Sequence, residues 1–182
     1  MSDTVSGGDP GTGLVDLSGL RVFVGGPIQH ALGHNSFHRP LRETIQAVIT
    51  AVTQAGATVF SAHVAEKFGQ DTPLFSPEDV SARDLEWMRR CDVFVPVLPT
   101  DADGALMRTD GTHIELGWAS ALGRPIVMVT TLPVPAGASH LLRGLPSVAD
   151  VGVVDVAELH RGGPGELLLR LGKVGRDAVV TP

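Results

Sequence analysis

Cysteine is almost absent from this sequence, in which Cys91 stands alone among 182 residues. A single cysteine excludes an intramolecular disulfide framework and a zinc site built on cysteines. The sequence also lacks an uninterrupted apolar run of the roughly 18 residues that a membrane span requires. Its first segment has neither the basic region nor the apolar region of a secretory signal. We therefore expect a cytoplasmic protein that does not interact with membranes.

Positive charge is scarce as well. The chain has 14 Lys and Arg against 20 Asp and Glu, which gives a net charge of −6. This balance argues against a nucleic-acid backbone or an anionic membrane as a partner. A small anionic ligand remains compatible, because it needs only a local group of donors. The content of 43% hydrophobic and 19% charged residues is typical of a globular domain of ordinary size.

The chain divides into a polar leader and one domain. Residues 1–18 are mostly Gly, Ser, Thr, Asp and Pro, and we expect a disordered leader there and a single domain over residues 19–182. Short apolar strands are predicted at 20–26, 57–63, 92–98, 125–130 and 151–156, with helices at about 41–55, 77–91, 112–123 and 165–174. Strands that alternate with helices indicate an α/β fold, here a doubly wound, five-stranded parallel sheet.

Ligands of such sheets bind at the carboxyl ends of the strands, near the reversal in strand order. Three predicted connections begin at that edge: Gly25-Gly26-Pro27, Ala62-His63 and the segment 98–112. The third is long for an α/β connection, which itself indicates a binding role.

The end of that third connection carries small polar residues where a helix begins. Thr109, Gly111 and Thr112 could donate backbone and hydroxyl groups to a phosphate there. Asp110 beside them would repel an anion unless its side chain turns away.

Glu115 is the one charged residue between Ile114 and Gly123, in a predicted helix without a polar face. The spacing Thr112-x-x-Glu115 matches a capping box, in which the glutamate bonds back to the cap amide, so a structural role is open. A catalytic role is open too, because this helix begins at the ligand edge of the sheet. Its amino terminus would keep Glu115 ionised, as a nucleophile requires.

Asp84 is a second carboxylate in an unexpected place. It lies four residues from Val80 and Met88 and three from Trp87, and so belongs to the apolar stripe of its helix. The polar face of the same helix consists of Arg83, Glu86 and Arg90. A buried carboxylate must be paired, neutral or functional. Two carboxylates at one pocket suit a retaining glycosidic mechanism, in which one attacks the anomeric carbon and the other handles the proton of the leaving group.

Other motifs are weaker. Gly25-Gly26-Pro27 lacks the G-x-G-x-x-G spacing, so we expect no dinucleotide cofactor. His30, His34 and His38 have the spacing of metal ligands on a helix, but Gly33 and Pro40 disfavour a helix there, and we expect no metal site. A Ser-His-carboxylate triad lacks support because no G-x-S-x-G elbow is present.

Four segments, "VFVGGPI", "SAH", "DLEWMRRCDVFVPVLP" and "GTHIELGWASALGRPIVMV", together resemble the nucleoside 2-deoxyribosyltransferase family over about residues 21–144. The resemblance is closest to the N-glycosidases of that family that act on nucleoside 5′-monophosphates such as CMP. It implies a flavodoxin-like fold, a small nucleotide or nucleoside as substrate, and a homodimer with shared active sites. By this likeness Glu115 is the nucleophile that forms a covalent glycosyl intermediate, and Asp84 assists departure of the base.

The resemblance also implies which residues bind the substrate. They are Phe23, Gly25, Gly26, Pro27 and Ile28 after the first strand, His63 and the Phe68 region at the base, Thr109, Gly111 and Thr112 near the 5′ group, and Ser139, which would enter the site of a neighbouring subunit.

Two of these positions and a third, Gln29, bear on the substrate. Phe23 replaces a tyrosine common in the transferases, which would leave room for a ribose 2′-hydroxyl. Thr109 stands where nucleoside-specific transferases have an acidic residue for the free 5′-hydroxyl, which favours a 5′-phosphate. Gln29, by contrast, stands where the hydrolases carry a phosphate-facing arginine.

Our preferred interpretation is hydrolysis of a nucleoside 5′-monophosphate to ribose 5-phosphate and free base. Base exchange through the same intermediate is the nearest alternative, and a nucleotide-binding module without turnover is another. The cytokinin-activating phosphoribohydrolases share G-T-x-x-E, but their longer P-G-G-x-G-T-x-x-E motif is not met by "MRTDGTHIE". The sequence does not identify the base.

Overall fold

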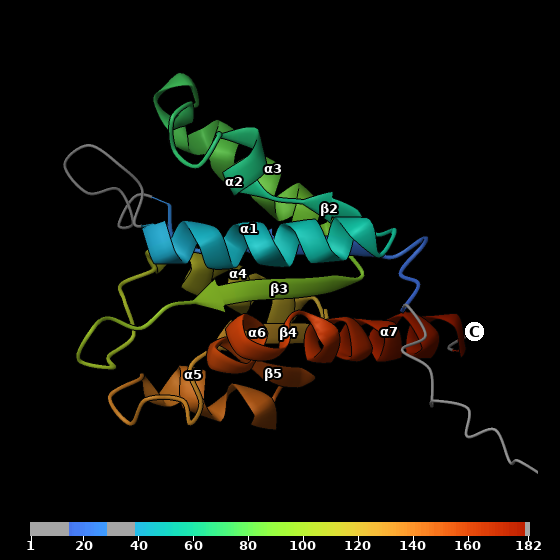
Figure 1. The fold of residues 1–182 in the computed structure, drawn as a ribbon. Coiled ribbons are helices and arrows are strands. Elements are labelled where there is room, and N and C mark those ends of the chain that lie inside the picture. Colours follow the sequence, from blue (N-terminus) through green and yellow to red (C-terminus); the bar gives the residue numbers. More distant parts are fainter. Residues whose placement is uncertain (1–14, 29–38, 181–182) are drawn as a thin grey trace, which may run out of the picture.

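A single parallel sheet organises the chain in our computed structural model, which describes residues 15–28 and 39–180. Its strands are β1 (Arg21–Gly25), β2 (Thr58–Phe60), β3 (Val93–Leu98), β4 (Ile126–Thr130) and β5 (Val151–Asp155). They pair in parallel in the order β2-β1-β3-β4-β5 (Figure 1). This is the flavodoxin-like order, in which the direction of winding reverses between β1 and β3. The predicted five-stranded parallel sheet is confirmed.

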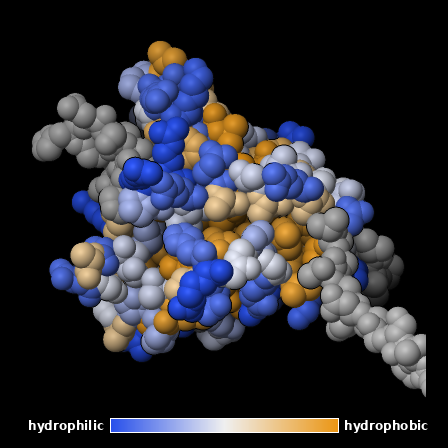
Figure 2. All heavy atoms as spheres, viewed as in Figure 1, coloured by the Kyte–Doolittle hydropathy of each residue, from blue (hydrophilic) through white to orange (hydrophobic). Residues whose placement is uncertain are grey.

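Helices cover both faces of the sheet (Figure 1). One layer contains α1 (Arg39–Gln54), α6 (Val156–Gly162) and α7 (Gly165–Val180), and the other contains α3 (Pro77–Arg90), α4 (Asp110–Ala121) and α5 (His140–Gly144). The outward side of the first layer is largely hydrophilic, with hydrophobic patches between (Figure 2). Among the described ranges, no helix combines the length and the apolar character that crossing a bilayer demands.

The short helices α2 (Ala62–Ala65), α5 and α6 differ from the sequence predictions. The second strand was expected to reach residue 63, but it ends at Phe60 because Ser61 already has the extended backbone of a helix N-cap. His63 consequently lies on a helix rather than on a strand. The sequence did not predict α5 or α6, since segments this short show little periodicity.

Alternate residues of each strand belong to different layers of the core. Val22 and Val24 of β1 pack toward α1, whereas Phe23 between them packs toward α3 and α4. Every residue of β3 is buried, as its continuous apolar run predicts for a strand covered on both faces.

The expected leader is shorter than its composition indicates. The Leu17 side chain is only 3% exposed, and its backbone N–H donates to the Ala55 carbonyl at 2.7 Å. Val15 also packs against the core. The boundary expected at residue 18 is therefore wrong, because two apolar side chains before it are packed against the folded domain. Residues 1–14 lie outside the described part of the chain.

The start of α3 is fixed by its sequence. Ser76 Oγ accepts from the Asp79 backbone N–H at 3.1 Å, the Asp79 carboxylate accepts from the Ser76 N–H at 3.3 Å, and Pro77 occupies the first turn. This reciprocal capping confirms the predicted N-cap and sets which side chains of α3 face the sheet.

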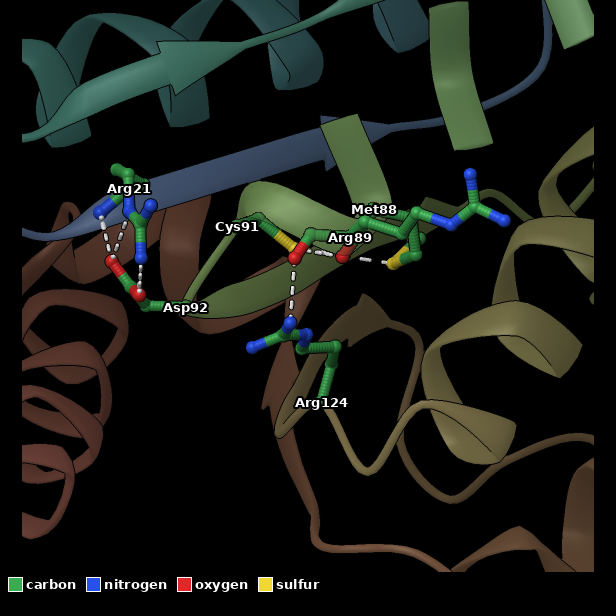
Figure 3. A network of polar contacts seen from close by, with 6 residues as sticks. All are labelled: Arg21, Met88, Arg89, Cys91, Asp92 and Arg124. Carbon is green, nitrogen blue, oxygen red and sulfur yellow. Dashed lines mark hydrogen bonds and ion pairs between the residues drawn. The ribbon is translucent and has the colours of Figure 1, made fainter. Parts of the chain in front are cut away.

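Polar contacts at the amino ends of the strands tie the layers together (Figure 3). The Asp92 carboxylate accepts from the Arg21 backbone N–H at 2.8 Å and from the Arg21 guanidinium at 2.6 and 3.0 Å, which joins β1 to the entry of β3. Arg124, before β4, donates to the Arg89 carbonyl at the end of α3. Cys91 lies buried beside them, and burial raises the pKa of its thiol to about 11, so it is not a reactive nucleophile.

The core on the α7 side offers a matched test of packing. Leu171 is fully buried, while Leu169 on the same helix is 53% exposed. We expect Leu171→Ala to lower the free energy of unfolding by about 2–5 kcal/mol, because it leaves a cavity. Leu169→Ala should change it by less than about 0.5 kcal/mol. Urea titration followed by circular dichroism measures both values, and equal losses would contradict this placement of α7.

Candidate active site

A cavity of about 310 Å³ opens at the carboxyl ends of the strands, beside the reversal between β1 and β3. Its volume is within the range of small-molecule sites. Four parts of the chain line it: the turn after β1, the helix α2, the first half of α3 with Phe75 before it, and the start of α4.

Most of the predicted site residues meet at this cavity. Those that line it are Gly25, Gly26, Pro27, Ile28, His63, Asp84, Thr109, Gly111, Thr112 and Glu115. These residues are far apart in the sequence, and the parallel sheet brings the ends of their helices and strands together.

Phe23 and Ser139 do not line the cavity. Phe23 is fully buried, with its ring centroid 5.8 Å from that of Trp87 and 5.2 Å from that of Phe94. Aromatic rings of α3 and β3 pack against Phe23, and its expected role at the sugar stays a prediction. Ser139 is an exposed N-cap of α5, where its hydroxyl accepts from the Leu142 N–H at 3.2 Å.

Two other groups of residues bear on cofactors. Gln29, His30, His34 and His38 lie outside the described residues. Within the ranges 15–28 and 39–180, no group of three His, Cys, Asp or Glu side chains is arranged to hold a metal ion.

Glu115 projects into the cavity from the second turn of α4 and is only 8% exposed. The capping-box interpretation is wrong, because α4 begins at Asp110 with Thr109 as its N-cap, so that Thr112 is already inside the helix. The expected effect of the helix terminus on the charge of Glu115 is opposed by the surroundings of its carboxyl group. Burial raises the pKa of Glu115 well above its ordinary value, the charge of Asp84 raises it further, and Arg83 lowers it in part. The effect of the helix dipole falls off within the first turn.

The α4 helix is less buried than its sequence indicated. Ile114, next to Glu115, is 55% exposed. The lack of a polar face on this helix predicted that it is buried all round. That prediction failed at Ile114, since single apolar side chains also occur on protein surfaces.

Asp84 lies across the cavity on α3 and is 7% exposed, as its place in the apolar stripe predicted. Its Oδ1 accepts a hydrogen bond from Arg83 Nε at 2.8 Å. Burial raises the pKa of Asp84, the hydrogen bond and charge of Arg83 oppose this, and the negative charge of Glu66 adds to it. Since Asp84 and Glu115 share the cavity and affect each other's charge, their protons are bound by the pair rather than by either residue alone.

Arg83 and Glu66 are functional candidates that the sequence did not reveal. Arg83 was placed on the polar face of α3, but its side chain is only 18% exposed and its Nη2 lies 2.6 Å from Oε1 of Glu66. Glu66 is 2% exposed and lines the cavity. Adjacent residues on a helix point in different directions, so nothing in the spacing predicted that Arg83 would reach Asp84.

An unusual turn holds Glu66 in place. Lys67 and Phe68 have φ values of 47° and 55°, in the left-handed region that favours glycine, and Gly69 follows at 90°. The turn reverses the chain directly after Glu66, and Thr72 then donates its hydroxyl to the Glu66 carboxylate. Non-glycine residues in this region carry strain that the surrounding structure must offset, a feature that clusters at functional sites.

His63 lies in the wall of the cavity and is fully buried. Burial lowers the pKa of its imidazole to about 4, and its Nε2 lies 3.4 Å from the Pro27 carbonyl. His63 is therefore uncharged near neutral pH. It can take part in hydrogen bonding to a ligand but cannot contribute a positive charge.

The start of α4 presents donors to the cavity. Thr112 is 2% exposed, and its hydroxyl has no hydrogen-bond partner among the residues that the structure describes. The Thr109 hydroxyl lies 2.8 Å from Nδ1 of His113. Asp110 forms an ion pair with Arg108 at 2.6 Å, which offsets the charge that would repel an anion. A helix amino terminus with a spare hydroxyl favours a negatively charged group.

The fold and this pair of carboxyl groups define an α/β protein with a small-molecule site at the topological switch point. Comparison with known sequences identifies the group: the profile of the nucleoside 2-deoxyribosyltransferase family matches residues 32–153, and the chain belongs to that family. Membership of this family supports the conclusion that the protein is an enzyme that acts on nucleosides or nucleotides. A search of curated proteins found no significant match.

Solved structures agree with this assignment. The solution structure of BlsM matches with a TM-score of 0.65 and 28% sequence identity, over 89% of this chain and 94% of BlsM. The CMP N-glycosidase BcmB from Clostridium botulinum matches with a TM-score of 0.52 and 22% identity, over 83% of this chain and 96% of BcmB. At that identity BcmB supports the fold alone.

The raised pKa of Glu115 makes stability depend on pH. A carboxyl group whose pKa is raised by folding favours the folded state while it is protonated, and that contribution is lost as pH rises through the folded pKa. Glu115→Gln cannot ionise. We expect equal melting temperatures near pH 4 and a higher melting temperature for the variant at pH 8, by about 3 °C or more, which corresponds to about 1 kcal/mol.

Differential scanning calorimetry between pH 4 and pH 8 measures this difference. The matched control is Glu158→Gln on α6, whose carboxylate is 61% exposed in a surface pair with Arg161. An advantage of Glu115→Gln that shrinks as pH rises would contradict the burial of Glu115.

Gly25 lies in close contact with Glu115, the candidate nucleophile. A Cβ at Gly25 would lie 2.7 Å from Oε2 of Glu115 and 2.8 Å from Cε2 of Phe94, so one of them must move. We expect Gly25→Ala to destabilise the protein by about 1–3 kcal/mol. In the control Gly117→Ala, on α4, the Cβ meets nothing within 4 Å, and stability should rise by about 0.5–1 kcal/mol. Urea titration distinguishes the two, and equal stabilities would refute the close approach.

Proposed function

We propose that this protein hydrolyses the N-glycosidic bond of a nucleoside 5′-monophosphate through a covalent glycosyl intermediate on Glu115. The products are free base and ribose 5-phosphate, and a CMP-like ribonucleotide is the first candidate substrate. The observation that carries the proposal is the pair of buried carboxyl groups, Asp84 and Glu115, on one cavity. The family match, the likeness to BlsM and the activity named for BcmB support it.

The mechanism uses the two acids in turn. The pair holds one proton, and in the reactive form that proton lies on Asp84. The Glu115 carboxylate then attacks the anomeric carbon, the bond to the base nitrogen breaks, and the base leaves with the electron pair and takes the proton from the Asp84 carboxyl group. Asp84, now ionised, removes a proton from water, which attacks the same carbon and breaks the ester to Glu115. The pair then holds one proton again, as at the start. Burial strengthens each electrostatic step, because little water screens the charges.

The amino terminus of α4 supplies the binding site for the 5′-phosphate in this proposal. The Thr112 hydroxyl, which has no hydrogen-bond partner within the described ranges, and the first turn of α4 provide donors there. Thr109, which stands where a negatively charged side chain would repel a phosphate, is 3% exposed and neutral. Neutral His63 and the apolar side chains of Phe75 and Val80 are suited to a planar base.

Base exchange is the second candidate, because the family's description is that of a transferase. The same glycosyl intermediate would then be attacked by a second nucleobase instead of water. Incubation of the protein with each common nucleoside 5′-monophosphate, with and without a second free base, separates these reactions. Ribose 5-phosphate formed without an acceptor indicates hydrolysis, and a new nucleotide formed only with the acceptor indicates transfer.

We also propose that the protein forms a homodimer in which Ser139 approaches the site of the neighbouring subunit. Two observations support it. The segment from Ser139 to Leu141 is exposed, with Leu141 at 88%, and Ile114 is exposed beside Glu115. Sedimentation equilibrium tests the assembly, and an Ile114→Glu variant that remains as associated as the wild type would exclude that face.

Removal of the nucleophile tests the mechanism directly. We expect Glu115→Ala to lower kcat for base release by at least about 10³-fold, because the covalent intermediate cannot form. Circular dichroism should show an unchanged fold. Glu158→Gln is the control and should retain full activity. Wild-type rates in Glu115→Ala would remove Glu115 from the mechanism.

A further inference from the structure

Asp84 and Glu115 are buried at one cavity and need a nearby positive charge, and in the described part of the chain that charge is Arg83. Its Nε lies 2.8 Å from Oδ1 of Asp84, and its Nη2 lies 2.6 Å from Oε1 of Glu66. The guanidinium of Arg83 thus links Asp84 to a second carboxylate, that of Glu66, which is 2% exposed. The planar fork of arginine allows both contacts at once, which a lysine ammonium cannot reproduce.

Aromatic rings fix the position of this guanidinium. The Arg83 Cζ lies 4.8 Å from the centroid of the Trp87 ring and 5.4 Å from that of the Phe75 ring. Trp87 is itself stacked on Phe60, with centroids 6.0 Å apart and planes at 4°. The charge is therefore held by packing as well as by its two carboxylate partners.

We propose that Arg83 is a positioning residue, which fixes the Asp84 carboxylate at the cavity and, together with Glu66, sets how tightly Asp84 and Glu115 bind their proton. The importance of this role for catalysis rests on the function proposed above. Arg83 favours the ionised acids, and Glu66 opposes it. A buried Arg–Glu pair thereby tunes the catalytic pair without contacting the substrate through Arg83.

The charged groups around the acids come from three elements. Neutral His63 lies on α2, and Glu66 is the C-cap of that helix. Arg83 lies on α3, and Asp110 lies at the start of α4. Asp110 is compensated by Arg108 at 2.6 Å. Of the turn after β1 the described residues at the cavity are Gly25, Gly26, Pro27 and Ile28, and none of these four carries a charged side chain. Arg83 and Glu66 are thus the two charges that act on the pair most directly.

The directions of the pKa shifts support this arrangement. The charge of Arg83 lowers the pKa of both Asp84 and Glu115, while the charge of Glu66 raises that of Asp84. Removal of Arg83 and removal of Glu66 should consequently shift the titration of the pair in opposite directions. A residue with a merely structural role would not produce opposite signs.

The test is the titration of the side-chain carboxyl carbons of Asp84 and Glu115 by NMR in the ligand-free protein. We expect Arg83→Gln to move the titration of the pair upward by about 1–3 pH units, the effect of one close opposite charge. Glu66→Gln should move it downward, and the double variant should lie between them. Arg83→Lys keeps the charge, and so should move it less than Arg83→Gln. The control is Arg89→Gln, an exposed arginine on the same helix, which should leave it unchanged.

Activity provides the second readout. In Arg83→Gln the acidic limb of the pH profile of kcat should move to higher pH, because the nucleophile must lose its proton to attack. If Arg83→Gln does not fold, Glu66→Gln still tests the proposal, because it should move the titration of Asp84 and Glu115 downward. Unchanged titrations, or shifts of the same sign in Arg83→Gln and Glu66→Gln, would overturn the proposal. Shifts as expected in a protein that cleaves no nucleotide would refute the proposed function and leave the role of Arg83 standing.

Discussion

Repulsion between Asp84 and Glu115 is the constraint on which the site depends. Both residues are more than nine-tenths buried on one cavity, where ionisation of both carboxyl groups at once costs free energy. The surrounding structure limits this cost with one cation, Arg83, which is held by a buried glutamate and two aromatic rings. Gly25 leaves the space that Glu115 occupies. Burial of two carboxyl groups on one cavity lowers stability, a cost that is common at functional sites.

The order of the strands decides which parts of the chain meet at this constraint. Because β1 lies between β2 and β3, the connections after all three strands emerge side by side, and the winding reverses at that point. The same order buries β3 on both faces and places α3 and α4 together on one side of the sheet. The two acids thus come from adjacent helices rather than from one segment. The amino ends of the strands carry the Arg21–Asp92 link instead, away from the cavity.

Local signals in the sequence were reliable where a short-range interaction fixes the backbone. Ser76 and Pro77 predicted the start of α3, and helical spacing then predicted that Asp84 is buried. The signals failed where packing determined the direction of a long side chain or the first residue of a helix. Thr112 and Glu115 match a capping box, yet α4 begins earlier, and Arg83 bends back from the expected polar face to reach Asp84. No periodicity describes such contacts, since they depend on side chains from other elements.

By itself the sequence determined the parallel α/β fold, the ligand edge of the sheet and the burial of one acid, because these follow from hydrophobic patterning and helix capping within short windows. It also contained the four segments by which the family is recognised. Only the tertiary structure decided that Glu115 shares its cavity with Asp84, that Glu66 contacts Arg83, and that Phe23 packs against Trp87 and Phe94. The physical reason is range: desolvation and charge–charge interaction depend on distance in space, and the sheet sets that distance between residues far apart in the chain.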